Sequence, residues 1–267
     1  MFMTNTYIVN PVEPEILGLL NLKKNLYFKM NSSFGMLSNK FLNSSIVEGA
    51  MSVEFQDEYA QALDNLAIAL QNSYEQMRSL CATDTDFAYT QAIANRLRAF
   101  YIMQSKTKYF LNKRVAQAGS DFFVETILFF LKLFNDVEGL NLEIASERTV
   151  QPKRNAMRPD ISIWSGSELL AVVECKTQLG WSRHNWKSDF ENREQKLKEV
   201  FPDAKMFLVV MSSCNWSGFG DDLKVGKQLF CLLNIWPTAL SATPTSDMLY
   251  TPIESLLEQL VELQSRD

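Results

Sequence analysis

Asp160, Glu174 and Lys176 are the residues of this sequence whose types and spacing best suit chemistry. Asp160 opens one segment of alternating apolar and polar residues, and Glu174 and Lys176 end the next, with thirteen residues between Asp160 and Glu174. If residues 165–167 form a hairpin turn, positions whose numbers sum to about 333 or 334 pair across the two strands, and Asp160 lies opposite Val173 or Glu174. The two carboxylates are therefore expected to converge.

Alternation along the second strand adds the lysine to this pair. Glu174 and Lys176 share one face of the strand, while Val173 and Cys175 point to the other. Two neighbouring carboxylates repel each other, and a divalent cation that prefers oxygen ligands, Mg²⁺ rather than Zn²⁺, relieves the repulsion at neutral pH. An ammonium beside it can orient an attacking water or stabilise charge that develops on phosphorus. Together these groups predict phosphodiester hydrolysis.

The elements that must position these residues are predicted from apolar spacing and turn signals. Residues 1–50 have irregular periodicity and indicate short helices or loops. The remaining pattern gives helices over 53–80, 87–118 and 122–134, strands over 141–150, 158–164 and 168–175, a helix in the second half of 181–200, strands over 205–212 and 228–236, and a helix over 252–264. This order predicts an α/β fold with a mixed central sheet flanked by helices, divided into a helical region 1–118 and a core 119–267.

Composition limits the other possibilities. The chain has 267 residues, 46% of them hydrophobic, and a net charge of −5, which suits a globular protein and argues against binding nucleic acid by bulk charge. One histidine, His184, excludes Ser-His-Asp triads and multi-histidine metal sites unless it acts alone, and four scattered cysteines do not make a zinc site. No segment has the signature of a signal peptide or a membrane span, so we expect a cytoplasmic location.

Pro159-Asp160, followed thirteen residues later by Glu174-Cys175-Lys176, resembles the PD-(D/E)xK motif of the restriction-endonuclease-like nuclease superfamily. The order of elements from about Asp121 to Trp236 also resembles the core of that superfamily, which is a helix, a three-stranded antiparallel meander, a helix and further strands. The resemblance implies that Asp160 and Glu174 ligate Mg²⁺ and that Lys176 acts on the nucleophilic water. It implies no nucleotide cofactor.

Two further residues match the pattern less specifically. Glu125 stands in an otherwise apolar helix before the meander, where many superfamily members carry a glutamate, although an acid in the first turn also suits the helix dipole. Gln178 follows Lys176 on the same face and completes an E-x-K-x-Q pattern, although it can equally cap the strand end. Both are candidate catalytic residues.

Two other matches to parts of the motif lack its context. Glu194-Gln195-Lys196 lies inside a predicted helix without an upstream aspartate. Pro202-Asp203 and Asp222-Leu223-Lys224 flank a Gly/Ser-rich loop rather than the end of an apolar strand. The alternative for Asp160, Glu174 and Lys176 is a surface cluster of salt bridges on an unrelated sheet.

Basic residues gather near the motif, since residues 148–198 hold ten Lys/Arg and six Asp/Glu. Phosphate contacts supply most of the sequence-independent affinity for DNA, so these cations are candidate backbone contacts, although each alone is more often a plain surface charge. The segment 181–186 mixes tryptophan, Arg, His and Asn, and either reads bases or anchors the next helix. The candidate DNA-binding residues are Lys153, Arg154, Arg158, Arg183, Asn185 and Lys187.

A second basic segment lies at 86–118, with a net charge of +5, and predicts a basic surface that is either a DNA contact or a solvated helix face. Together with the resemblance, these features lead us to expect a Mg²⁺-dependent endodeoxyribonuclease on double-stranded DNA, most like a homodimeric type II restriction endonuclease. The alternatives are a nuclease of repair, recombination or phage defence that acts on structured or modified DNA, and a non-catalytic nucleic-acid-binding protein. The helical region 1–118 would serve DNA recognition, dimerisation or both.

Overall fold

The computed structural model describes residues 57–114, 119–154, 156–179, 185–214, 222–241, 245 and 247–264. The chain divides into two compact units, residues 1–70 and 71–267. Helix α3 (Glu58–Cys81) begins in the first unit and ends in the second. The sheet, its flanking helices and the candidate site all belong to the second unit.

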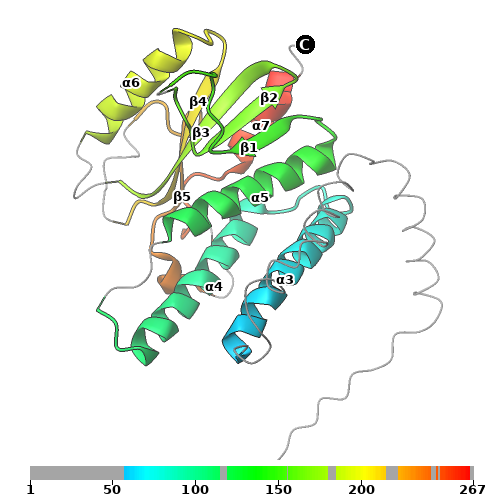
Figure 1. Cartoon of the computed structure of the whole chain (residues 1–267), viewed down its shortest axis with the longest axis vertical. Helices are drawn as coiled ribbons and strands as arrows, with labels where there is room; N and C mark the ends of the chain where they lie inside the picture. The colour runs from blue at the N-terminus through cyan, green and yellow to red at the C-terminus, as the bar shows by residue number, and fades with distance from the viewer. Residues whose placement is uncertain are drawn as a thin grey trace, which may run out of the picture. The chain divides into compact units, whose positions relative to one another are not determined.

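A five-stranded mixed sheet forms the centre of the second unit (Figure 1). Its strands lie in sequence order, and the first three are antiparallel neighbours, whereas the last two run parallel to the third. The α/β class and the mixed sheet are therefore confirmed, with the antiparallel meander limited to the first three strands. The strands are β1 (Glu143–Ser146), β2 (Ile161–Ser165), β3 (Glu168–Gln178), β4 (Lys205–Ser212) and β5 (Leu229–Leu233).

Helices cover both faces of this sheet. On one face, Val173 of β3 belongs to the same apolar cluster as Phe123, and on the other face, Val172 packs with Phe190 and Leu197. Alternate residues of one strand thus enter two different cores, as the pleat requires. The first face carries α4 (Tyr89–Phe110), α5 (Ser120–Glu138) and α7 (Glu254–Gln264), the second carries α6 (Trp186–Lys198), and a short 3₁₀ helix, η3 (Pro237–Ala239), follows β5.

Local sequence explains where the elements that frame the site begin and end. Helix α5 ends at Glu138, and the capping residue Gly139 has a φ of +66°, the left-handed conformation that glycine adopts without strain. Gly166, in the two-residue connection between β2 and β3, has a φ of +56°, as the primed hairpin turns require at that position. Within the described ranges, none of the helices, α5 included, is long and apolar enough to cross a membrane.

Helix α4 belongs to the compact unit that contains the sheet. The division into a helical region 1–118 and a core 119–267 stays a prediction. The buried Leu97 of α4 joins the same apolar cluster as α5. Two of its basic residues also face the protein rather than solvent: the Arg96 guanidinium lies 3.8 Å from the centre of the Phe129 ring, and Arg98 Nε donates to the Leu240 carbonyl. The basic surface of α4 is therefore smaller than the number of its Lys and Arg residues indicates.

Core packing predicts different costs for the same substitution at two leucines. Leu131 of α5 is fully buried, so Leu131→Ala should lower the free energy of unfolding by about 2–5 kcal/mol through lost contacts and a residual cavity. Leu223 is 91% exposed, so Leu223→Ala should change it by less than about 0.5 kcal/mol. Urea unfolding measures both values, and equal losses would contradict this assignment of the core.

Candidate active site

The register of β2 and β3 brings Asp160 to the level of Glu174. Ile161 pairs with Val173, so the same antiparallel register puts Asp160, the residue just before β2, opposite Glu174. Nearer the turn, a bulge shifts the pairing by one, so that Trp164 pairs with Leu169. Both registers allowed by the hairpin turn are thus present, and the one near the site confirms the expected juxtaposition.

Asp160 is held by hydrogen bonds from two strands. Its Oδ2 accepts the backbone N–H of Cys175 at 2.7 Å, which fixes the carboxylate against β3. Its carbonyl accepts the Glu147 N–H at 3.1 Å and the Ser146 hydroxyl at 3.2 Å. Glu147 has a φ of +49°, the left-handed region that side chains disfavour, and this turn after β1 directs its N–H to Asp160. The carboxylate therefore has a fixed position.

The Lys176 ammonium lies close to both carboxylates. Its Nζ lies 3.6 Å from Asp160 Oδ2 and 3.6 Å from Glu174 Oε2. The Asp160 and Lys176 side chains are 30% and 28% exposed, whereas that of Glu174 is 5% exposed. One ammonium thus neutralises part of the charge of two acids, of which one is open to solvent and the other is buried.

Arg193 of α6 is a fourth charged residue at this point, and the sequence did not assign it to the site. Its Nη2 donates to Glu174 Oε1, the oxygen that does not face Lys176. The sequence did indicate a buried contact for this residue, because Arg193 occupies a position on the apolar face of α6 between Phe190 and Leu197. A cation placed there needs a carboxylate partner on the sheet beneath it.

Burial dominates the electrostatics of Glu174 and raises its pKa above the usual range. Arg193 and Lys176 oppose that rise, while the neighbouring Asp160 adds to it. Burial also raises the pKa of Cys175, which keeps its thiol protonated and unsuited to act as a nucleophile. The carboxylates and the cations are therefore left as the candidate reactive groups of this site.

A cavity of about 310 Å³ opens beside these residues. Asp160, Lys176 and Gln178 line it from the sheet, and Glu125 lines it from the first turns of α5. Glu174 does not line it, in accord with its burial. The structure thus places Glu125 and Gln178 in the same cavity as Asp160 and Lys176, and their catalytic roles stay predictions.

The predicted DNA-binding residues lie around this region in different settings. Arg158 pairs with Glu147 at 3.3 Å, with both side chains more than half exposed, and Lys187 pairs with Asp222 at 2.8 Å. Lys153 and Arg154 are exposed on the loop between β1 and β2. Their contacts with DNA stay predictions.

The tryptophan-containing segment is described only in part. Asn185 precedes α6, and Trp186 packs against the apolar cluster on the α6 face of the sheet. Trp181, Arg183 and His184 lie outside the described residues. Anchoring of the helix is therefore confirmed for Trp186, and base contacts by Asn185 and Arg183 stay predictions.

The partial motif matches are in other surroundings. Glu194 lies on α6 and forms ion pairs with Lys198 at 3.1 Å and Lys224 at 3.4 Å. Asp203 lies in the exposed connection after α6. Neither shares the convergence seen at Asp160.

Neither protein-family models nor curated proteins match this sequence. Among solved structures, the native BbvCI A2B2 tetramer at low resolution matches with 10% identity and a TM-score of 0.34, over 78% of this chain and 90% of that chain. A TM-score this low does not establish a shared fold.

The contact between Arg193 and Glu174 predicts a pH-dependent stability. Arg193→Ala should lower the free energy of unfolding by about 1–3 kcal/mol at neutral pH, because a buried carboxylate loses its hydrogen-bond donor. The loss should shrink as pH falls through the raised pKa of Glu174, since the neutral acid does not need a counter-charge.

Lys198→Ala is the matched control on the same helix. Lys198 pairs with Glu194 four residues away and is half exposed, so its removal should cost less than about 0.5 kcal/mol. Urea unfolding at several pH values measures both variants. A deficit for Arg193→Ala that is the same at acid and neutral pH would contradict the assigned role.

Proposed function

We propose that this chain is a Mg²⁺-dependent endonuclease that hydrolyses phosphodiester bonds in double-stranded DNA. The observation that carries the proposal is the Lys176 ammonium, 3.6 Å from an oxygen of Asp160 and 3.6 Å from an oxygen of Glu174. Two acids and an amine at one strand end, beside an open cavity, are the groups that this chemistry needs.

The donor set suits Mg²⁺. Protein sites for this ion usually supply one or two carboxylates, and water and substrate phosphates complete the shell. Among the described residues, no group of three or more His, Cys, Asp or Glu is placed to hold a metal. This argues against a metal site closed entirely by protein ligands there. It is compatible with two carboxylates that share an ion with the substrate. Asp160 and Glu174 would hold the ion, and Glu174 would exchange its Arg193 contact to do so.

Each residue has a role that its position supports. When bound, Mg²⁺ supplies Lewis-acid stabilisation of the charge that develops on the phosphate. Asp160, fixed by the Cys175 N–H, presents its carboxylate to the cavity. Lys176 can donate a hydrogen bond to the attacking water or to a phosphate oxygen, and Glu125 and Gln178 line the space where water and phosphate would enter.

We propose more specifically that the enzyme is a type II restriction endonuclease that acts as a homodimer, since a two-fold symmetric DNA site matches a two-fold symmetric protein. We place it in the cytoplasm. Discrete fragments from plasmid DNA would support site-specific cutting, and structure-dependent nicks would support the repair or recombination alternative.

The contact between Arg193 and Glu174 favours the non-catalytic alternative, a protein that binds nucleic acid without cutting it. Arg193 occupies an oxygen of Glu174 that a metal ligand needs free. A protein that kept this fold only to bind nucleic acid would have no reason to release that contact. Metal-dependent cleavage therefore separates the two functions.

Asp160 and Asp203 each follow a proline, so their asparagine variants form a matched pair. Asp160→Asn should abolish Mg²⁺-dependent cleavage of supercoiled plasmid DNA, because it removes a charged metal ligand. Asp203→Asn changes the exposed Pro202-Asp203 pair and should cleave like the wild type. Agarose gels with Mg²⁺ and with EDTA measure this, and unchanged cleavage by Asp160→Asn would exclude the mechanism.

The Lys176 ammonium should contribute to the rate of cleavage. Lys176→Met should slow cleavage at saturating Mg²⁺ by about 10²–10⁴-fold, the range expected for removal of a group that assists proton transfer or stabilises developing charge. Lys227→Met, at an exposed lysine away from the cavity, should have no effect. Single-turnover rates make the comparison, and a loss below threefold for Lys176→Met would remove Lys176 from the reaction.

A further inference from the structure

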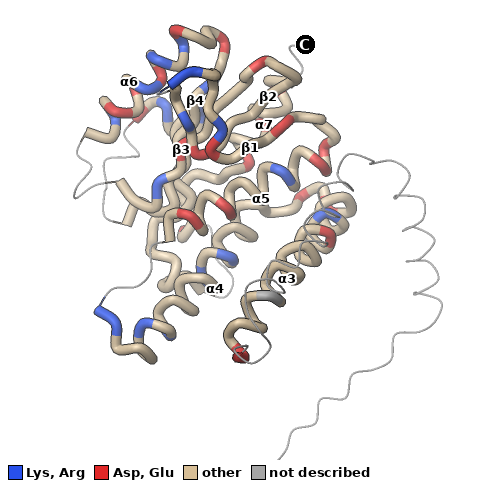
Figure 2. Tube along the Cα trace, in the orientation of Figure 1, with Lys and Arg blue, Asp and Glu red and all other residues tan. Residues whose placement is uncertain are grey.

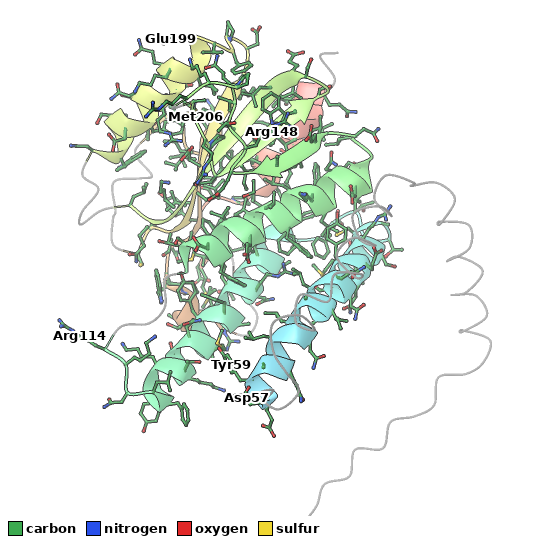
Figure 3. The ribbon with its side chains drawn as sticks, in the orientation of Figure 1. Asp57, Tyr59, Arg114, Arg148, Glu199 and Met206 are labelled. Atoms are coloured by element: carbon green, nitrogen blue, oxygen red, sulfur yellow. The ribbon has the colours of Figure 1, made fainter. Side chains whose placement is uncertain are left out.

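A second cavity lies between α6 and the loop that connects β1 to β2, and we call it the α6 groove. It has a volume of about 460 Å³, and its charged lining consists of Lys153, Arg158, Arg193 and Lys196 against one acid, Glu199. Glu199, labelled in Figure 3, follows the last turn of α6. The groove therefore carries an excess of positive charge.

The walls of the α6 groove are anchored to the protein core. Val150 and Met157 bracket the loop, and both contact the apolar cluster that holds α6 on the sheet. The Val150 N–H donates to the Met157 carbonyl at 2.9 Å, which closes the base of the loop. Lys153 and Arg158 therefore lie on a loop that is anchored to the core at both ends and faces α6.

Ion pairs among the described residues neutralise only part of the positive charge in the α6 groove. Among the described residues, no ion pair involves Lys153 or Lys196. Arg158 has only its exposed pair with Glu147, and the Nε of Arg193 has no hydrogen-bond partner within the described part of the chain. Figure 2 shows Lys and Arg positions on α6 and on the loop that passes beside it.

We propose that the α6 groove binds a backbone phosphate of DNA, in addition to the phosphate at the Asp160 site, an inference that rests on the proposed function. Lysine and arginine donors suit a phosphodiester anion. The described lining contains no aromatic side chain on which a base could stack, which favours backbone over base recognition.

Arg193 relates this groove to the candidate active site. The same side chain lines the groove and donates to Glu174. A phosphate bound here is therefore a neighbour of the phosphate to be cut, and the two contacts would fix one DNA strand at two points. Such a contact raises affinity without regard to sequence.

The test measures DNA binding without catalysis. A fluorescent duplex is titrated with the full chain in EDTA at several salt concentrations, and anisotropy gives the affinity. Lys196→Ala and Lys153→Ala should each weaken binding about 5- to 10-fold near 0.1 M salt and reduce the salt slope by about 1, as expected for the loss of one phosphate contact. Lys198→Ala, on the same helix but outside the groove and paired with Glu194, should bind like the wild type.

Two outcomes would overturn the proposal: wild-type affinity and slope in both groove variants, or an equal loss in Lys198→Ala, which would indicate a general charge effect. The result is separable from the nuclease proposal. Reduced binding by the groove variants in a protein that never cleaves DNA would support the groove and reject the nuclease, and cleavage with an intact salt slope in the groove variants would do the reverse.

Discussion

Two carboxylates that meet at the end of a strand must be balanced by positive charge, and this requirement explains the residues around β3. Glu174 is buried, so its ionised form is costly, and Lys176 and Arg193 each supply one cation to it. Asp160 is more exposed and gains an N–H from Cys175. The resulting cluster is nearly neutral as it stands, and a divalent cation could take over the compensation that Arg193 now provides.

The hairpin that creates this cluster could be predicted because its determinants are local. A short turn with Gly166 fixes which residues face each other, and alternation fixes that Glu174 and Lys176 share a face while Val173 enters the opposite core. The order of helices and strands from residue 120 onward was predictable for the same reason, since each buried strand is a short apolar run bounded by turn residues. The mixed sheet followed from that order.

Other features depend on which elements pack together, and the sequence does not state this. Arg193 was visible as part of a helical pattern, but its partner Glu174 follows only once α6 is known to cover that face of β3. The charge of α4 predicted a basic surface, yet Arg96 stacks on Phe129, because the apolar face of α4 is buried in the core and carries that arginine toward α5.

Diffraction from crystals soaked in Mn²⁺ can show whether Asp160 and Glu174 share one cation. Anomalous density should lie in contact with both carboxylates, with Arg193 withdrawn from Glu174, and should vanish in crystals of Asp160→Asn. Density bound elsewhere on the chain while Arg193 stays on Glu174, at a Mn²⁺ concentration that supports DNA cleavage, would contradict the account.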